Sequence, residues 1–166
     1  MKVTEIRGSV TSEQTEQLAG AFASAFGPKF PLSPDFEGRL NEKRELSVLV
    51  AKSDELVGFK IGYERYRGIF FSWLGGVIES SRRKGIAREL LRRQHRLCLD
   101  RGYSEIQTEA SGDGKAILLL NIQEGFEVYG TYLGADGGLR VQLRKFLVPN
   151  KSEQIGDANA VKPLGC

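Results

Sequence analysis

The sequence predicts an α+β domain with α/β/α layering, built on a mixed, mostly antiparallel sheet of six or seven strands with flanking helices. Short β-rich runs occur in pairs separated by turn residues near both ends of the chain, which is typical of antiparallel hairpins. Between them, one long amphipathic segment separates two strand-like runs, which is typical of a crossover helix that joins parallel strands. A length of 166 residues suits one domain with its own core.

The first half of the chain predicts four strands and two helices. Polar and apolar residues alternate over 2–7, and Thr11 or Ser12 can cap a helix that runs to about Phe26. Prolines after residue 27 interrupt the chain. The remaining elements expected here are a short helix within 35–45 and strands at 46–51, 56–66 and 69–78.

The second half predicts two helices and three strands. The helix over 84–101 has the clearest apolar face, and Gly102 is typical of the residue that follows a helix. The other elements expected are a strand at 103–110, a helix at 115–124 and strands at 126–133 and 139–148. We therefore assign the domain to residues 1–148 and expect the polar tail, residues 149–166, to be disordered.

Composition narrows the class of protein. A net charge of +3 is too mild to indicate a nucleic-acid partner. The two cysteines, Cys98 and Cys166, form neither a disulfide framework nor a metal-ligand pattern, so no metal is expected. The chain shows no signal peptide and no membrane-spanning stretch, which predicts a cytoplasmic protein with no membrane partner. We expect Cys98 to be a core residue and His95, the single histidine, to be solvated or partly packed.

The stretch from residue 74 to 91 contains the clearest candidate for a binding site. A strand leads through a glycine- and serine-bearing turn into a helix that opens on basic residues, with Ser80 and Ser81 where a helix would be capped. The first amides of a helix lack internal partners, and the macrodipole adds partial positive charge there. Gly85 and Ala87 leave room for a bulky anion to approach this backbone. The stretch predicts a phosphate or pyrophosphate site.

Two motifs resemble those of the GNAT acyltransferase superfamily. The run RRKGIA at 82–87 fits its arginine-x-x-glycine-x-glycine/alanine signature, and LLLNIQEGF at 118–126 resembles its second conserved helix with the following glycine–phenylalanine. The motifs occur in the expected order and at the expected separation, and the resemblance covers residues 2–147. It implies that acetyl-coenzyme A is the co-substrate, bound where the strands at 69–78 and 103–110 splay apart. The residues expected to bind it are Gly76, Val77, Ile78, Arg82, Arg83, Lys84, Gly85, Ile86, Ala87, Arg88 and Asn121.

The resemblance also implies the reaction. We expect an N-acetyltransferase, in which the primary amine of a small molecule or peptide attacks the thioester directly in a ternary complex. The alternative is an acyl-coenzyme A binding module or sensor without turnover, because Asn121 stands where many family members have a tyrosine and cannot act as a general acid. Tyr129, Glu64 and Glu79 are the candidates for proton transfer, although Tyr129 also fits a packing residue and Glu79 a surface residue.

Three further interpretations stay open. Gly75 and Gly76 indicate either a close backbone approach by the ligand or relief of crowding under Trp73. Phe26, Phe30 and Phe36 are acceptor contacts or, as we favour, core residues. The arginines further along the basic helix, Arg92, Arg93 and Arg96, are expected to form a solvated face, and a homodimer would form through the final strands.

Overall fold

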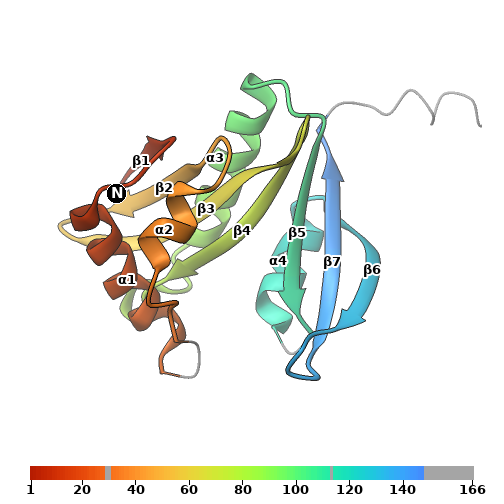
Figure 1. Ribbon diagram of the computed structural model, residues 1–166. Helices are drawn as coiled ribbons and strands as arrows, with labels where there is room; N and C mark the ends of the chain where they lie inside the picture. Colours follow the sequence, from red (N-terminus) through yellow and green to blue (C-terminus); the bar gives the residue numbers. More distant parts are fainter. Residues whose placement is uncertain (29–30, 113, 148–166) are drawn as a thin grey trace, which may run out of the picture.

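Seven strands form one mixed sheet in the order β1-β2-β3-β4-β5-β7-β6 in the computed structural model, which describes residues 1–28, 31–112 and 114–147 (Figure 1). The strands are β1 (Lys2–Arg7), β2 (Ser47–Lys52), β3 (Leu56–Tyr66), β4 (Ile69–Val77), β5 (Glu105–Ser111), β6 (Glu127–Leu133) and β7 (Leu139–Phe146). The helices are α1 (Ser12–Phe26), α2 (Phe36–Asn41), α3 (Ile86–Asp100) and α4 (Lys115–Gln123), with a 3-10 turn, η1, over Glu79–Ser81. The predicted sheet with flanking helices is confirmed.

Only one pair of neighbouring strands in this sheet is parallel. β4 and β5 run in the same direction because α3 connects them as a crossover, whereas every other neighbouring pair is antiparallel. β1 to β4 follow one another as a meander. β7 lies between β5 and β6, so the last hairpin extends the sheet on the far side of β5 (Figure 1).

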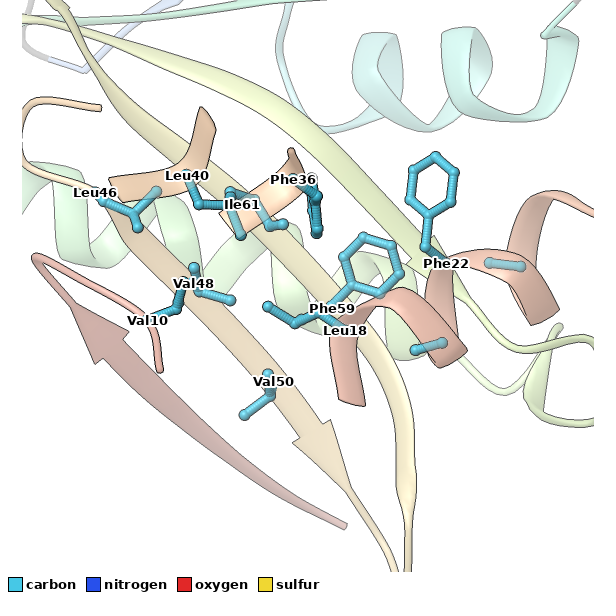
Figure 2. Close-up of a cluster of buried hydrophobic side chains, with 12 residues drawn as sticks. Val10, Leu18, Phe22, Phe36, Leu40, Leu46, Val48, Val50, Phe59 and Ile61 are labelled. Carbon is cyan, nitrogen blue, oxygen red and sulfur yellow. The ribbon is translucent and has the colours of Figure 1, made fainter. Parts of the chain in front are cut away.

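Helices α1 and α2 cover one face of β2, β3 and β4. Figure 2 shows the apolar side chains that meet there: Leu18 and Phe22 from α1 and Phe36 and Leu40 from α2 lie over Phe59, Ile61 and Val48 of the strands. Leu40, Val48 and Ile61 have no exposed surface. This cluster fixes β4 and the end of α1 against each other, and both belong to the site described below.

Helices α3 and α4 cover the opposite face. Ile86 and Leu90 of α3 pack on Leu49 and Val57, while Leu91 and Cys98 join a second cluster under β5 and β7. Among the described residues no helix covers the other face of the β5–β7–β6 part, and β6 is exposed at six of its seven positions, Gly130 excepted. None of the described helices is long and apolar enough to cross a membrane.

Most predicted element boundaries are confirmed to within two residues. Thr11 caps α1 through a capping box with Gln14, and Gly102 follows α3 with a φ of +76°. One capping prediction is wrong: Ser80 and Ser81 lie in η1, and the N-cap of α3 is Gly85 in the left-handed conformation. The tail, residues 149–166, and Phe30 lie outside the described residues.

Candidate active site

A cleft opens where β4 and β5 part. Their parallel pairing covers only residues 69–72 of β4 and 105–108 of β5. Beyond Ser72 and Thr108, β4 pairs only with β3 and β5 only with β7 (Figure 1). The cleft has a volume of about 730 Å³ and is lined by residues of α1, β3, β4, α3, β5 and α4. The predicted splaying of the sheet between these strands is therefore present.

Residues 73–77 of β4 form a free strand edge inside this cleft. Backbone amides and carbonyls of a strand point alternately to its two sides, and β3 satisfies only one of these sides. The other side has no strand partner along this stretch. An extended ligand arm that carries its own amides can pair with such an edge.

The two glycines of this edge have different environments. A Cβ atom on Gly76 would lie 2.8 Å from the Cβ of Ala25 and 3.1 Å from the ring of Phe59, so α1 packs against a position that only glycine fits. A Cβ atom on Gly75 would lie 3.5 Å from the Cγ and Nζ atoms of Lys60, which is an ordinary contact. Crowding thus explains why a glycine is needed at position 76, but the crowding comes from Ala25 and Phe59 rather than from Trp73.

The N-terminus of α3 meets the requirements of an anion site. Gly85 has φ +80° and ψ 0°, no side chain caps the helix, and a Cβ atom built on Gly85 would meet nothing within 4 Å. The amides of Ile86, Ala87 and Arg88 donate to no group among the described residues. These free donors at the positive end of the helix dipole, beside the β4 edge, fit a pyrophosphate and its attached arm.

The basic side chains around this loop are largely engaged with the protein itself. Arg82 donates to the carbonyl of Ala25 at 2.5 Å and to that of Val77 at 3.4 Å, while Lys84 donates to the carbonyl of Ser80 at 3.1 Å. Arg88 contacts α4 through Gln123 at 2.7 Å and Glu124 at 3.0 Å. Among the described residues only Arg83 of these four has no partner. Arg83, which is exposed, is therefore the basic side chain of this loop that stays available to a ligand.

Asn121 contributes to the cleft from α4. It is 3% exposed, it lines the cleft, and its side chain has no hydrogen bond to a described residue. Its neighbour Glu124 binds Arg88 and Arg92 of α3, and the hydrogen bond from Arg92 lowers the pKa of Glu124. These ion pairs hold α4 and Asn121 against α3.

The three residues predicted for proton transfer lie outside the cleft lining. Glu64 accepts from the Tyr103 hydroxyl at 3.2 Å at the far end of β3, and Glu79 is exposed in η1. Tyr129 is 40% exposed on β6 beneath Arg144, and burial of its hydroxyl raises its pKa. The structure does not bring these residues together.

Three charged residues that the sequence did not predict for the site also line the cleft: Lys60 and Glu109 come from strands, and Lys115 comes from the start of α4. Glu109 of β5 accepts a hydrogen bond from the Tyr132 hydroxyl at 2.7 Å and lies 3.8 Å from Arg65. Lys60 of β3 is 9% exposed. Lysine and glutamate in β-rich runs usually face solvent, and only the packing of α3 over β3 and the parting of β4 from β5 place Lys60 and Glu109 inside.

The wall on the α2 side of the cleft mouth is aromatic and cationic. Trp73 lines the cleft and stacks edge-on with Tyr63 at 5.8 Å, with Arg39 5.4 Å above its ring. Phe26 also lines the cleft, whereas Phe36 is a core residue at 5% exposure, as favoured. Side chains on this face alternate with those that face α3, so the cleft has two chemically distinct sides.

The deep residues of α3 behave as packing residues. Cys98 is 1% exposed, and burial raises the pKa of its thiol to about 12. His95 packs against Phe126, and burial, with help from Lys145, lowers its pKa to about 3. Arg92 and Arg96 are exposed, with ion-pair partners in Glu124 and Glu89. No group of three or more possible metal ligands occurs in the described parts of the chain.

The model of the acetyltransferase (GNAT) family matches residues 13–120, which include the β4 edge and the whole α3 loop. The chain belongs to the GNAT acetyltransferase family. It is therefore an acyltransferase, and the cleft between β4 and β5 is the candidate active site of this GNAT protein. No curated protein sequence matches the chain significantly.

Solved structures share the fold of this GNAT chain at low sequence identity. The ribosomal-protein-S18-alanine N-acetyltransferase from Escherichia coli superposes with a TM-score of 0.73 at 16% identity, covering 89% of this chain and 96% of that one. Ard1 from Thermoplasma volcanium gives 0.74 at 16% identity, covering 89% and 99%. An aminoglycoside 6'-N-acetyltransferase in complex with coenzyme A gives 0.73 at 15% identity, covering 90% and 99%.

Proposed function

We propose that this GNAT protein is an N-acetyltransferase that moves an acetyl group from acetyl-coenzyme A to the primary amine of a small molecule or peptide. The observation that carries the proposal is the junction of a free β4 edge with an uncapped helix N-terminus. The edge suits the amide-bearing arm of the donor, and the amides of Ile86, Ala87 and Arg88 suit its pyrophosphate. Structural neighbours that act on an alanine of a ribosomal protein and on an aminoglycoside support an amine acceptor.

The chain's own residues have distinct roles in this reaction. The free helix amides and Arg83 bind the phosphates, residues 73–77 orient the arm, and Asn121 contacts it from α4. Acetyl-coenzyme A supplies an activated thioester when bound. A β4 amide that points into the cleft polarises the thioester carbonyl, and the loss of one such donor typically costs about 3 kcal/mol of transition-state stabilisation.

In the proposed reaction, Glu109 places a negative charge on the side of the cleft from which the acceptor amine enters. Its carboxylate lines the cleft at the start of the gap, and it belongs to the sheet face of Arg65 and Tyr132 rather than to the α3 face. A carboxylate there binds the ammonium group of an incoming amine and accepts its proton, directly or through water. Glu109 therefore replaces Glu64, Glu79 and Tyr129 as the candidate base in the proposed mechanism.

The test is release of free thiol from acetyl-coenzyme A across a panel of small amines, polyamines, aminoglycosides and peptides. We expect release with at least one class of acceptor, and a loss of about 100-fold in kcat/KM for Glu109→Gln with coenzyme A affinity unchanged. The matched control is Glu105→Gln, on the same face of β5 but outside the cleft lining.

An acyl-coenzyme A sensor is the second candidate, favoured by Asn121 in place of the family's tyrosine. Calorimetric binding of coenzyme A without acyl transfer to any acceptor would establish the sensor. Absence of both binding and release would contradict both candidates.

A further inference from the structure

Lys60 has an ammonium group inside the cleft without a counter-ion. It lies between Phe59 and Ile61 on β3, is 91% buried since its exposure is 9%, and makes no ion pair or hydrogen bond with a described residue. A buried lysine usually has a carboxylate partner, because an unpaired buried charge is strongly destabilising. A charged, unpartnered side chain at this depth points to a ligand.

The position of Lys60 relative to β4 is set by the register of the sheet. Lys60 pairs with Gly75, and a Cβ atom on Gly75 would lie 3.5 Å from the Lys60 Nζ atom, so the lysine side chain lies over that glycine. Gly75 is three residues beyond Ser72, where β4 and β5 separate, which is about 10 Å along an extended strand. Gly75 is the middle residue of the free edge at residues 73–77, so the ammonium lies beside the middle of that edge.

Lys60 and Glu109 occupy opposite sides of the cleft. Lys60 faces α3, where Asn121 also enters the cleft, whereas Glu109 shares its face with Arg65 and Tyr132. The amine attacks one face of the planar thioester carbonyl, which gives a tetrahedral carbon on which the new nitrogen and the departing sulfur are separate substituents. An amine held on the side of Glu109 therefore leaves the sulfur free to lie toward Lys60 and Asn121 on the other side of the cleft.

The groups around Lys60 allow it to titrate in the neutral range. His95 and Cys98 face it from α3, and Arg82, Glu109 and Lys115 lie on the other walls of the cleft. Burial lowers the pKa of Lys60 to about 8, and the Cys98 thiol opposes this slightly. An alkyl thiol such as cysteine has a pKa of about 8.5, so proton transfer from this ammonium to a thiolate is close to balanced.

We propose that Lys60 is the general acid of the reaction and protonates the coenzyme A thiolate as it leaves, in the place of the tyrosine that Asn121 replaces. The inference rests on the proposed acetyl transfer. The nitrogen of the acceptor forms the new bond to the carbonyl carbon, the carbon–sulfur bond breaks with its electron pair on sulfur, and a proton moves from the Lys60 Nζ atom to that sulfur. The neutral lysine then regains a proton from solvent.

The test compares Lys60→Met, which removes the ammonium at similar volume, with Lys60→Arg, which keeps the charge but cannot release a proton at neutral pH. We expect Lys60→Met to lower kcat by about 100-fold and Lys60→Arg to lower it less, with coenzyme A affinity near that of the wild type in both. Lys52→Met, at an exposed lysine of β2, is the control and should leave kcat unchanged.

Two pH-dependent measurements separate a proton donor from a packing residue. The wild-type kcat should fall as the pH rises through about 8, because Lys60 acts in its protonated form, and this decline should be absent in Lys60→Arg. The ultraviolet absorbance of the bound coenzyme A thiolate should show a thiol pKa at least about one unit lower in the wild type than in Lys60→Met.

Each outcome distinguishes the inference from the function it rests on. A wild type that binds no coenzyme A would overturn the proposed function and this inference together. A wild type that transfers acetyl groups, with an unchanged pH profile and bound-thiol pKa in the variants, would overturn the role of Lys60 alone. If Lys60→Met does not fold, the pH profiles of the wild type and of Lys60→Arg still show whether Lys60 donates the proton.

Discussion

The two halves of the sheet are packed to different degrees. β2, β3 and β4 lie between helices on both faces, and their central residues are almost fully buried. The β5–β7–β6 half is covered on one face only, by α4 together with Leu91 and Cys98 of α3. Its last hairpin exposes large apolar side chains, namely Val128, Tyr129, Tyr132, Leu133, Leu139 and Phe146. The loop at residues 82–87 belongs to the tightly packed half. The hairpin of β6 and β7 belongs to the loosely packed half, where substitutions of exposed side chains should change stability little.

The largest expected effect is a difference in stability between the halves. Ile61→Ala in β3 removes a side chain with no exposed surface and should lower the free energy of unfolding by about 3 kcal/mol. Leu133→Ala in β6, where the side chain is 71% exposed, should change it by less than about 0.5 kcal/mol. Urea unfolding followed by circular dichroism measures both. Equal losses would show that the hairpin is as tightly packed as the core.

The second prediction compares the adjacent glycines within the packed half. Gly76→Ala places a Cβ atom 2.8 Å from the Cβ of Ala25, so α1 must shift, and we expect a loss of about 1–3 kcal/mol in unfolding free energy. Gly75→Ala makes only ordinary contacts and should stay within about 0.5 kcal/mol of the wild type. If thermal unfolding ranks the two variants the other way, the register of β4 against α1 described above is wrong.

The third prediction concerns binding at the loop of the packed half. Gly85→Glu adds a negative charge beside the free amides of α3 and should weaken coenzyme A binding at least about 10-fold, or 1.4 kcal/mol, in calorimetry. Gly85→Asn is the matched control, because asparagine tolerates the left-handed backbone and adds no charge. Equal affinities for the two variants would mean that the loss comes from strain rather than from electrostatics.

The smallest effect is expected where the two halves meet. Glu124→Gln removes the ion pairs of α4 with Arg88 and Arg92 and should cost about 0.5 kcal/mol at neutral pH, because both arginines are about half exposed. The pKa of Glu124 is lowered in the folded state, so this contribution is present above about 4.5 and is lost as the pH falls through the lowered value. Glu127→Gln, at an exposed pair on β6, is the control.

The sequence predicted the elements and the loop because both are local properties. Alternation predicted β1 and the apolar face predicted α3, and both are confirmed, whereas the anion site indicated by the run at residues 82–87 stays a prediction. The capping prediction at Ser80 and Ser81 failed because a 3-10 turn intervenes and Gly85 adopts the left-handed conformation instead. Turn geometry of this kind depends on how the loop is held by Ala25 and Val77.

The side chains inside the cleft were harder to predict. Lys60 and Glu109 line the same cleft only because β4 separates from β5 after Ser72, which no spacing in the chain encodes. Each is flanked along the chain by residues typical of ordinary half-exposed strands. The same limit explains why Glu64 and Glu79 were predicted although neither lines the cleft, since the sequence does not show which side chains face the gap.

The hydrogen bonds of Arg82 to Ala25 and Val77 have a consequence for how this loop would respond to mutation. These hydrogen bonds hold the loop against α1 and β4. We therefore expect replacement of Arg82 to weaken the binding of acetyl-coenzyme A indirectly, without removing a side chain that contacts the phosphates. Such a loss should persist at high ionic strength, whereas the loss from replacing Arg83 should shrink as added ions screen its attraction for the phosphates. Alanine substitutions measured in a single buffer would show a loss of coenzyme A affinity for both arginines. Repeating the measurement over a range of sodium chloride concentrations would distinguish Arg82, which holds the loop in place, from Arg83, which attracts the phosphates.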